Sequence, residues 1–263
     1  MTLYVIGNGF DIAHNIPVRY TYFRDYVKNK NTLDTFSFME ELFDLDQDWN
    51  NFEAALAKPK ELGKTIDDLE YGVHVRNEIK KLFEGWILET DAEVMSKDKT
   101  ARFDDSSIFF TFNYTSTLET LYGVDLKRIC HIHGFVVDKY FFTNESNYDL
   151  VFGHGEKSKH DLDISLKAHL YKDTEGCFYR SKKFLEDSSY YIDKIVVIGF
   201  SYSLIDIYYF QKMKEMMPTA KWYCGYHNDN DVKNRKVFMD KLGIKDYIGK
   251  FSNLELMKGF YNK

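Results

Sequence analysis

The chain has 263 residues, of which 44% are hydrophobic and 29% are charged, a balance that is typical of a globular protein of one or two domains. This composition excludes a disordered or a fibrous chain. Because 41 Asp and Glu outnumber 35 Lys and Arg, the net charge is −6, which argues against a broad nucleic-acid surface that neutralises many phosphates.

Apolar runs and helical periodicity predict alternating elements along the chain. A strand is expected at 3–6, followed by helices at 20–30, 34–45 and 61–96, and by strands at 108–112, 128–132, 149–152 and 195–198. A helix at 203–217, a strand at 221–225 and a helix at 230–242 complete the pattern. Continuous Val, Ile and Phe runs of this length are typical of strands buried on both faces, as in a parallel sheet. The alternation predicts an α/β fold with right-handed crossovers.

The segment between the first two strands is far longer than one crossover connection needs. We therefore expect residues 1–31 and 101–263 to form a core of mostly parallel sheet flanked by helices, and residues 32–100 to form an inserted helical subdomain. No apolar run approaches the roughly 18 residues that span a bilayer. The N-terminus lacks the features of a signal peptide, and three widely spaced cysteines suggest no disulfide framework, so we expect a cytoplasmic protein.

Glycine and polar residues gather at the carboxyl ends of the predicted strands, where open α/β sheets bind their ligands. Gly7-Asn8-Gly9 follows the first strand and leads toward a helix, whose N-terminus would favour a phosphate. An ordinary strand-to-helix turn explains these three residues equally well. Asp11 would repel a pyrophosphate, so it either caps the helix or faces a ribose hydroxyl or an attacking group.

Asn113 follows the second strand, where it either closes a turn or holds a water or a sugar hydroxyl through its amide. His131 and His133 are expected on one side of the third strand. Metal binding fits that spacing, but no Cys pair or Asp-x-His motif accompanies it, so we expect no metal. A histidine at a strand end also suits a general base, because it titrates near neutral pH.

His154 lies between two glycines, which predicts a binding loop. Ser201 follows Gly199 after the next strand, and Asp206 lies further on in the same segment. These residues also fit the cap of an ordinary helix. Glu53, within a helical segment, is the other ionisable group of interest. Together, these strand ends predict a nucleotide-like ligand rather than a purely structural domain.

An ordered set of motifs resembles the bacteriophage abortive-infection family AbiH, which implies a role in phage defence. The motifs are Gly7-Asn8-Gly9-Phe10-Asp11, Trp49-x-x-Phe52-Glu53, Phe112-Asn113-Tyr114-Thr115, Ile132-His133-Gly134, Gly153-His154-Gly155 and Gly199-Phe200-Ser201. They extend over nearly the whole chain.

The chain is more distantly similar to sirtuin-type NAD-binding domains, which implies a Rossmann-like, nucleotide-binding core. The sirtuin phosphate loop aligns with residues 7–20, where Asp11 replaces a serine. The sirtuin Asn and the catalytic His-Gly fall on Asn113 and His133, but the aspartate that orients nicotinamide is replaced by Thr115. A zinc module with four cysteines is missing, so we do not expect protein deacylation.

The resemblance implies a defence effector that hydrolyses the N-glycosidic bond of NAD or a related nucleotide and requires no cofactor. Asn113 would hold the water or the ribose, His133 would be the general base, and Asp11 would steady the sugar or the developing positive charge. Gly7, Gly9 and Ser201 would hold phosphates through backbone amides. The full set expected to bind the nucleotide is Gly7, Asn8, Gly9, His154, Gly199, Ser201 and Asp206.

Two other classes of function fit the same residues. A metal-dependent phosphoesterase or nuclease would use Asp11, His131, His133 and His154. A non-catalytic sensor would bind a nucleotide and signal through the helical insertion. The expected partners are a small nucleotide and a phage-derived trigger, and the sequence allows a homo-oligomer.

Overall fold

The computed structural model describes residues 1–30, 36–37, 39–41, 49, 52–58, 69–136, 150–155 and 166–262. These residues contain a five-stranded sheet in which every neighbouring pair is parallel, with strand order β3-β2-β1-β4-β5. The strands are β1 (Thr2–Ile6), β2 (Ile108–Thr111), β3 (Ile129–His131), β4 (Lys194–Ile198) and β5 (Lys221–Cys224). The first strand lies in the middle and the strand order reverses beside it, as in Rossmann-like folds, so the α/β prediction is confirmed.

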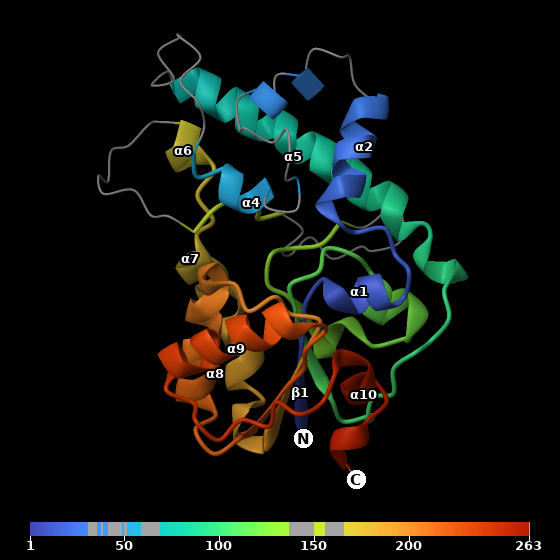
Figure 1. The fold of residues 1–263 in the computed structure, drawn as a ribbon, viewed down its shortest axis with the longest axis vertical. Helices are drawn as coiled ribbons and strands as arrows, with labels where there is room; N and C mark the ends of the chain where they lie inside the picture. The colour runs from blue at the N-terminus through green and yellow to red at the C-terminus, as the bar shows by residue number, and fades with distance from the viewer. Residues whose placement is uncertain are drawn as a thin grey trace.

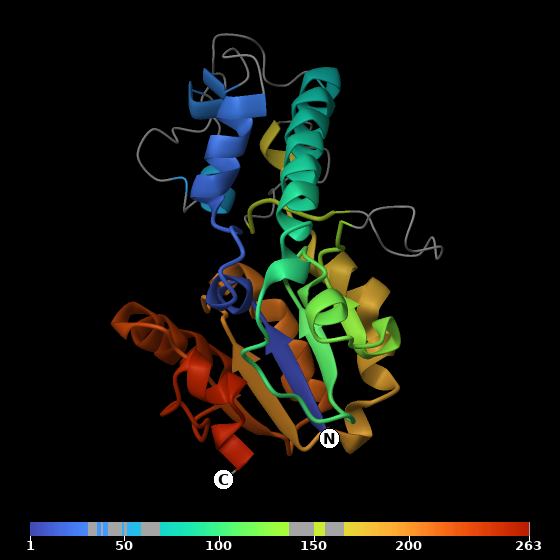
Figure 2. The same cartoon turned by 90° about the vertical axis from the view of Figure 1, so that its right-hand side faces the viewer.

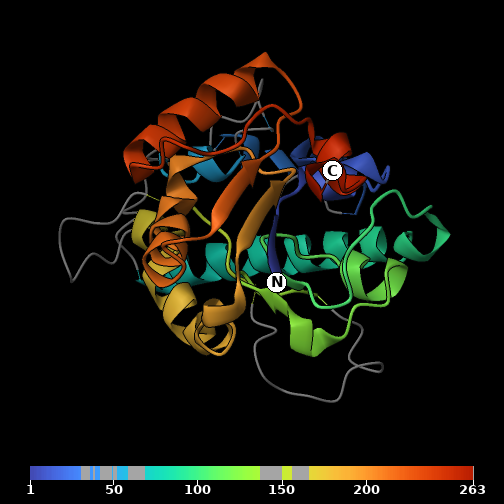
Figure 3. The same ribbon diagram turned by 90° about the horizontal axis from the view of Figure 1, so that it is seen from below.

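Helices cover both faces of the sheet (Figures 1 and 3). One face, which includes Leu3 and Val5, packs against α7 (Thr174–Glu186), α8 (Ile207–Met216) and α9 (Asp229–Leu242). The other face, which includes Tyr4 and Ile6, packs against α1 (Gly9–Ala13), the π-helical turn η3 (Thr117–Leu121) and α10 (Asn253–Met257). Side chains alternate between the two faces along β1, and all of them are buried, which explains the continuous apolar runs in the sequence.

A layer of helices lies beyond the carboxyl ends of the strands (Figure 2). It contains α2 (Tyr20–Lys30), α4 (Phe52–Ala55), α5 (Leu69–Asp91) and α6 (Leu166–His169). Phe23 packs against Phe52, Phe83 and Trp86, with ring centroids 5.5, 5.4 and 5.2 Å apart. The aromatic residues of these helices thus form a core of their own. We call these four helices together the helical layer.

The expected helices at 20–30, 203–217 and 230–242 are confirmed, with the second preceded by a 3-10 turn η6 (Leu204–Asp206). The helix expected at 61–96 covers 69–91, while residues 61–68 and most of 34–45 lie outside the described residues. The division into 1–31 with 101–263 and an inserted 32–100 stays a prediction. No helix within the described ranges is long and apolar enough to cross a membrane.

The strand expected at 149–152 is wrong, because residues 150–152 have an irregular backbone. Leu150 and Phe152 are buried in the helical layer instead, where the ring of Phe152 lies 5.7 Å from that of Phe83. Their apolar character therefore reflects packing on α5 and not pairing in the sheet.

Candidate functional site

A cleft of about 630 Å³ lies at the carboxyl ends of the strands, where residues of the helical layer also line it. Loops that follow all five strands contribute to its wall. The residues expected to act in catalysis or to bind the nucleotide all line the cleft except His154: Gly7, Asn8, Gly9, Asp11, Asn113, His133, Gly199, Ser201 and Asp206. Glu53, on α4, lines it as well.

The loops after β1 and β4 contact each other through their backbones. The amide of Gly7 donates to the carbonyl of Ile198 (2.9 Å), and the amide of Gly9 donates to that of Gly199 (2.8 Å). These two amides are therefore used within the protein, and the expectation that they hold phosphates is wrong. A Cβ atom on Gly7 would lie 2.6 Å from the oxygen of Gly199, so the glycines allow the two loops to pack closely.

Gly199→Ala is expected to lower the free energy of unfolding by about 3 kcal/mol or more, because a Cβ atom would add a clash to an unfavourable backbone. Gly199 has a φ of +66°, and its Cβ would lie 2.3 Å from the backbone nitrogen of Phe10. Gly123 has a φ of +68° but nothing within 4 Å of a Cβ. Gly123→Ala isolates the backbone strain, about 1 to 2 kcal/mol. If urea unfolding showed the same loss of unfolding free energy for both variants, the close approach of the loops after β1 and β4 would be contradicted.

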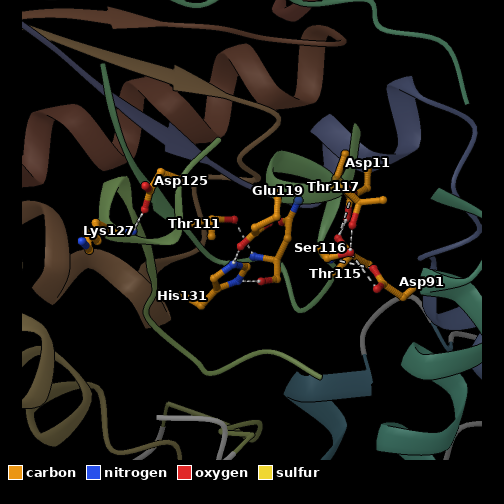
Figure 4. Close-up of polar contacts among 12 residues, drawn as sticks. Asp11, Asp91, Thr111, Thr115, Ser116, Thr117, Glu119, Asp125, Lys127 and His131 are labelled. Carbon is orange, nitrogen blue, oxygen red and sulfur yellow. Dashed lines mark hydrogen bonds and ion pairs between the residues drawn. The ribbon is translucent and has the colours of Figure 1, made fainter. Parts of the chain in front are cut away.

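Asp11 is fully buried, and one of its two carboxylate oxygens is open to a further partner. Oδ2 accepts a hydrogen bond from the hydroxyl of Thr115 (Figure 4), whereas Oδ1 has no partner among the described residues. Burial raises the pKa of Asp11 to about 6. Hydrogen bonds from the side chains of Thr115, Thr117 and Asn113 oppose this shift. Asp11 is thus an ionisable acceptor with an unused oxygen at the wall of the cleft.

Asn113 is held by its backbone and leaves its side-chain oxygen free. Its amide donates to the hydroxyl of Thr111 (3.1 Å), and its carbonyl accepts from Nδ1 of His131 (3.0 Å). The residue is 7% exposed, and its side-chain Oδ1 has no hydrogen-bond partner within the described part of the chain. Buried acceptors are nearly always paired with protein groups or ordered water, so this oxygen is a candidate acceptor for a ligand or a water.

His131 supports the loop that carries Asn113 and does not line the cleft. Strand β3 ends at His131, so the expectation of two imidazoles on one side of a strand is wrong. Its Nε2 lies 2.7 Å from Oε1 of Glu119, a buried pair that Figure 4 shows. Burial alone would lower the pKa of His131, but the Glu119 carboxylate raises it overall. The imidazole thus lies between the carbonyl of Asn113, to which Nδ1 donates, and the Glu119 carboxylate at Nε2.

His133 lies at the cleft, 2% exposed, with its Nε2 3.1 Å from the hydroxyl of Tyr209. The same nitrogen lies 3.9 Å from Oδ1 of Asp206. Burial, with a smaller effect of the nearby Lys172 ammonium, holds the pKa of His133 well below its usual value. The imidazole is therefore neutral at pH 7 and can accept a proton, as the expected general base requires.

Lys172 is a residue of the cleft that the sequence did not predict. Its Nζ lies 3.2 Å from Oδ1 of Asp206 and 3.9 Å from Oε2 of Glu53, and the residue is 2% exposed. Burial alone would lower the pKa of Lys172, but the two carboxylates raise it overall. No local pattern marks this lysine, because it lies in an irregular segment and its partners come from distant parts of the chain.

His154 does not line the cleft, so the expectation of a binding loop is wrong for its side chain. It is 1% exposed, and its Nε2 donates to the carbonyl of Lys167 (2.8 Å). Its amide donates to the carbonyl of Leu170 (3.0 Å). These bonds connect the segment at 150–155 with α6 and with the residue that follows it, which is a structural role.

The four groups of the metal hypothesis do not converge. Asp11, His131, His133 and His154 each contact a different partner, as described above. Among the residues that the structure describes, no group of three or more His, Cys, Asp or Glu side chains is placed to hold a metal ion.

The fold and its cleft define an α/β protein of Rossmann-like topology with a candidate ligand site at the strand ends. A family described as "Bacteriophage abortive infection AbiH" matches residues 3–75 and 64–226, so the chain belongs to this family. No curated protein sequence matches. The chain in a solved structure titled "Crystal structure of a Sir2 homolog-NAD complex" is 13% identical and has a TM-score of 0.45. The alignment covers 99% of this chain and 88% of that chain.

Proposed function

We propose that this chain is a phage-defence enzyme that hydrolyses the N-glycosidic bond of NAD or a related nucleotide. The observation that carries the proposal is that Asp11 and Asn113 each present a buried oxygen without a partner, within the described residues, to one cleft. Two such acceptors suit hydroxyl groups of a ribose and an attacking water. Membership of the AbiH family supports the role in defence.

Hydrolysis of this bond passes through an oxocarbenium-like state, in which positive charge develops on the ribose. The Asp11 carboxylate would stabilise that charge, and Oδ1 of Asn113 would accept a hydrogen bond from the water or from a ribose hydroxyl. The bond from C1′ to the base nitrogen breaks and leaves its electron pair on the base. The water oxygen then bonds to C1′, and its proton passes to the neutral imidazole of His133. NAD enters as the substrate, and water is the co-reactant.

In cells that express the protein, NAD is expected to fall after phage infection, because an activated glycohydrolase would consume it. His133→Ala and Asn113→Ala should each abolish the loss, since one removes the proton acceptor and the other removes the free oxygen. The measurement is mass spectrometry of the nucleotide pool, with immunoblots to confirm equal protein levels. A wild type that still protects the cells while the NAD pool stays constant would contradict the proposal.

A further inference from the structure

The charges at one end of the cleft do not balance. Two carboxylates, of Glu53 and Asp206, share the single ammonium of Lys172, at 3.9 and 3.2 Å. Asp206 is 8% exposed and Lys172 is 2% exposed, so water screens this group poorly. A second cation of the cleft lining, Arg19, is exposed. With all three groups ionised, one negative charge remains in excess, which is unfavourable away from water unless a further cation compensates it.

Aromatic rings form the wall beside these charges. The hydroxyl of Tyr20 donates to Oε1 of Glu53 (2.8 Å), and the Tyr20 ring lies 6.3 Å from Phe83 and 6.4 Å from Trp86. The ring of Phe83 lies 5.1 Å from that of Tyr114, and all four rings line the cleft. The faces of aromatic rings attract cations, most strongly where water is excluded. This part of the cleft therefore combines aromatic walls with an excess of negative charge.

Glu53 has one oxygen that is fixed and one that is available. Oε1 is held by Tyr20, whereas Oε2 lies 3.9 Å from the Lys172 ammonium, beyond hydrogen-bond distance. Its side chain is 24% exposed, compared with 11% for that of Asp206, which lies closer to the lysine. Glu53 is therefore the carboxylate of the pair that is better able to face a ligand.

We propose that this end of the cleft binds a positively charged aromatic ring, an N-ribosylated pyridinium, and that Glu53 makes the cleft select the charged ring over the neutral one. This inference rests on the proposed function, and it names the class of substrate. The ring supplies the charge that the Glu53, Lys172 and Asp206 group lacks. The unpartnered oxygens of Asp11 and Asn113 lie in the same cleft, where they are available to the attached ribose.

The chemistry of the leaving group agrees with this assignment. When the C1′–N bond of a pyridinium breaks, the electron pair neutralises the ring nitrogen, and the ring departs as a neutral molecule. Departure therefore needs no acid, which matches a cleft in which the His133 imidazole is neutral. A purine leaving group, in contrast, departs more easily when a general acid protonates it.

The test compares binding of oxidised and reduced carba-NAD, in which a methylene replaces the ring oxygen of the ribose next to nicotinamide and so blocks hydrolysis. Reduction removes the positive charge of the ring and largely keeps its shape. By titration calorimetry, we expect the full-length wild type to bind the oxidised form at least tenfold more tightly. Glu53→Gln should weaken binding of the oxidised form about tenfold and change binding of the reduced form less than threefold.

Glu89→Gln is the matched control, because Glu89 forms an exposed ion pair with Lys30 on the outside of the helical layer. It should bind both forms as the wild type does. Equal binding of the two forms by a wild type that hydrolyses NAD would overturn this inference and leave the proposed function standing. If Glu53→Gln weakened binding of the oxidised and the reduced form equally, the inference would also be overturned. Failure of the wild type to bind either form or to consume NAD would overturn the proposed function as well.

Discussion

Asn113→Ala is expected to lower the turnover of NAD by about 100-fold to 1,000-fold, the usual effect of removing one positioned polar group from a transition state. The free energy of unfolding should fall by no more than about 2 kcal/mol, because Oδ1 has no partner to lose within the described residues and the side chain gives up only its hydrogen bond to Asp11. The backbone bonds of Asn113 to Thr111 and His131 do not depend on its side chain. The two measurements are nicotinamide release by chromatography and unfolding in urea.

Asn77→Ala is a suitable control, since Asn77 is an exposed amide on α5. Its turnover should equal that of the wild type. If Asn113→Ala were folded and retained more than about a tenth of wild-type turnover, Asn113 would not touch the reacting atoms, and the assignment of the free oxygen to the water or the ribose would be wrong.

Asp11→Asn is expected to make the protein more stable and much less active. The pKa of Asp11 is about 6 in the folded protein and 3.8 in a model compound. The folded state thus holds this proton more tightly, and the contribution of Asp11 to stability is lost as pH rises from about 4 to about 6. At pH 7 the free energy of unfolding of Asp11→Asn should be about 1 to 3 kcal/mol higher than that of the wild type, because a buried charge has been removed.

The gain in stability should vanish below about pH 4, where Asp11 is protonated in both states. Turnover should fall at least about 100-fold at pH 7, because the neutral amide cannot balance the charge on the ribose. Wild-type turnover should rise as pH passes about 6, where Asp11 ionises. Urea unfolding at several pH values and a pH profile of turnover measure these effects. An active or destabilised variant would show that Asp11 is a structural residue.

The position of the site could be predicted from the sequence, because the carboxyl ends of parallel strands meet at one edge of a sheet. Buried runs followed by Gly7, Asn113, His133 and Gly199 were sufficient to place these residues together. Which atoms remain free could not be predicted. The amides of Gly7 and Gly9 are used because two loops pack against each other, and only the three-dimensional arrangement shows it.

The errors have physical causes that the sequence does not resolve. The apolar run at 150–152 packs against the helical layer and not against the sheet. The periodicity of apolar residues in the sequence does not distinguish these two packing partners. Lys172 enters the cleft because it pairs with Glu53 and Asp206, which lie far from it in the sequence. Helix α10, in contrast, was missed although its start is recognisable. Ser252 and Glu255 form a capping box, in which the amide of Glu255 donates to the hydroxyl of Ser252 (3.3 Å) and the amide of Ser252 donates to the carboxylate of Glu255 (2.7 Å).

The most direct test of the central claim is incubation of the purified protein with NAD and a panel of other nucleotides, with and without a metal chelator, followed by mass spectrometry. We expect nicotinamide and ADP-ribose to form from NAD at the same rate with and without the chelator, and Asn113→Ala to form both at least about 100-fold more slowly. Tight binding of NAD without products would indicate a sensor. Cleavage of phosphoester bonds that the chelator stops would contradict the assignment of the cleft to N-glycosidic hydrolysis.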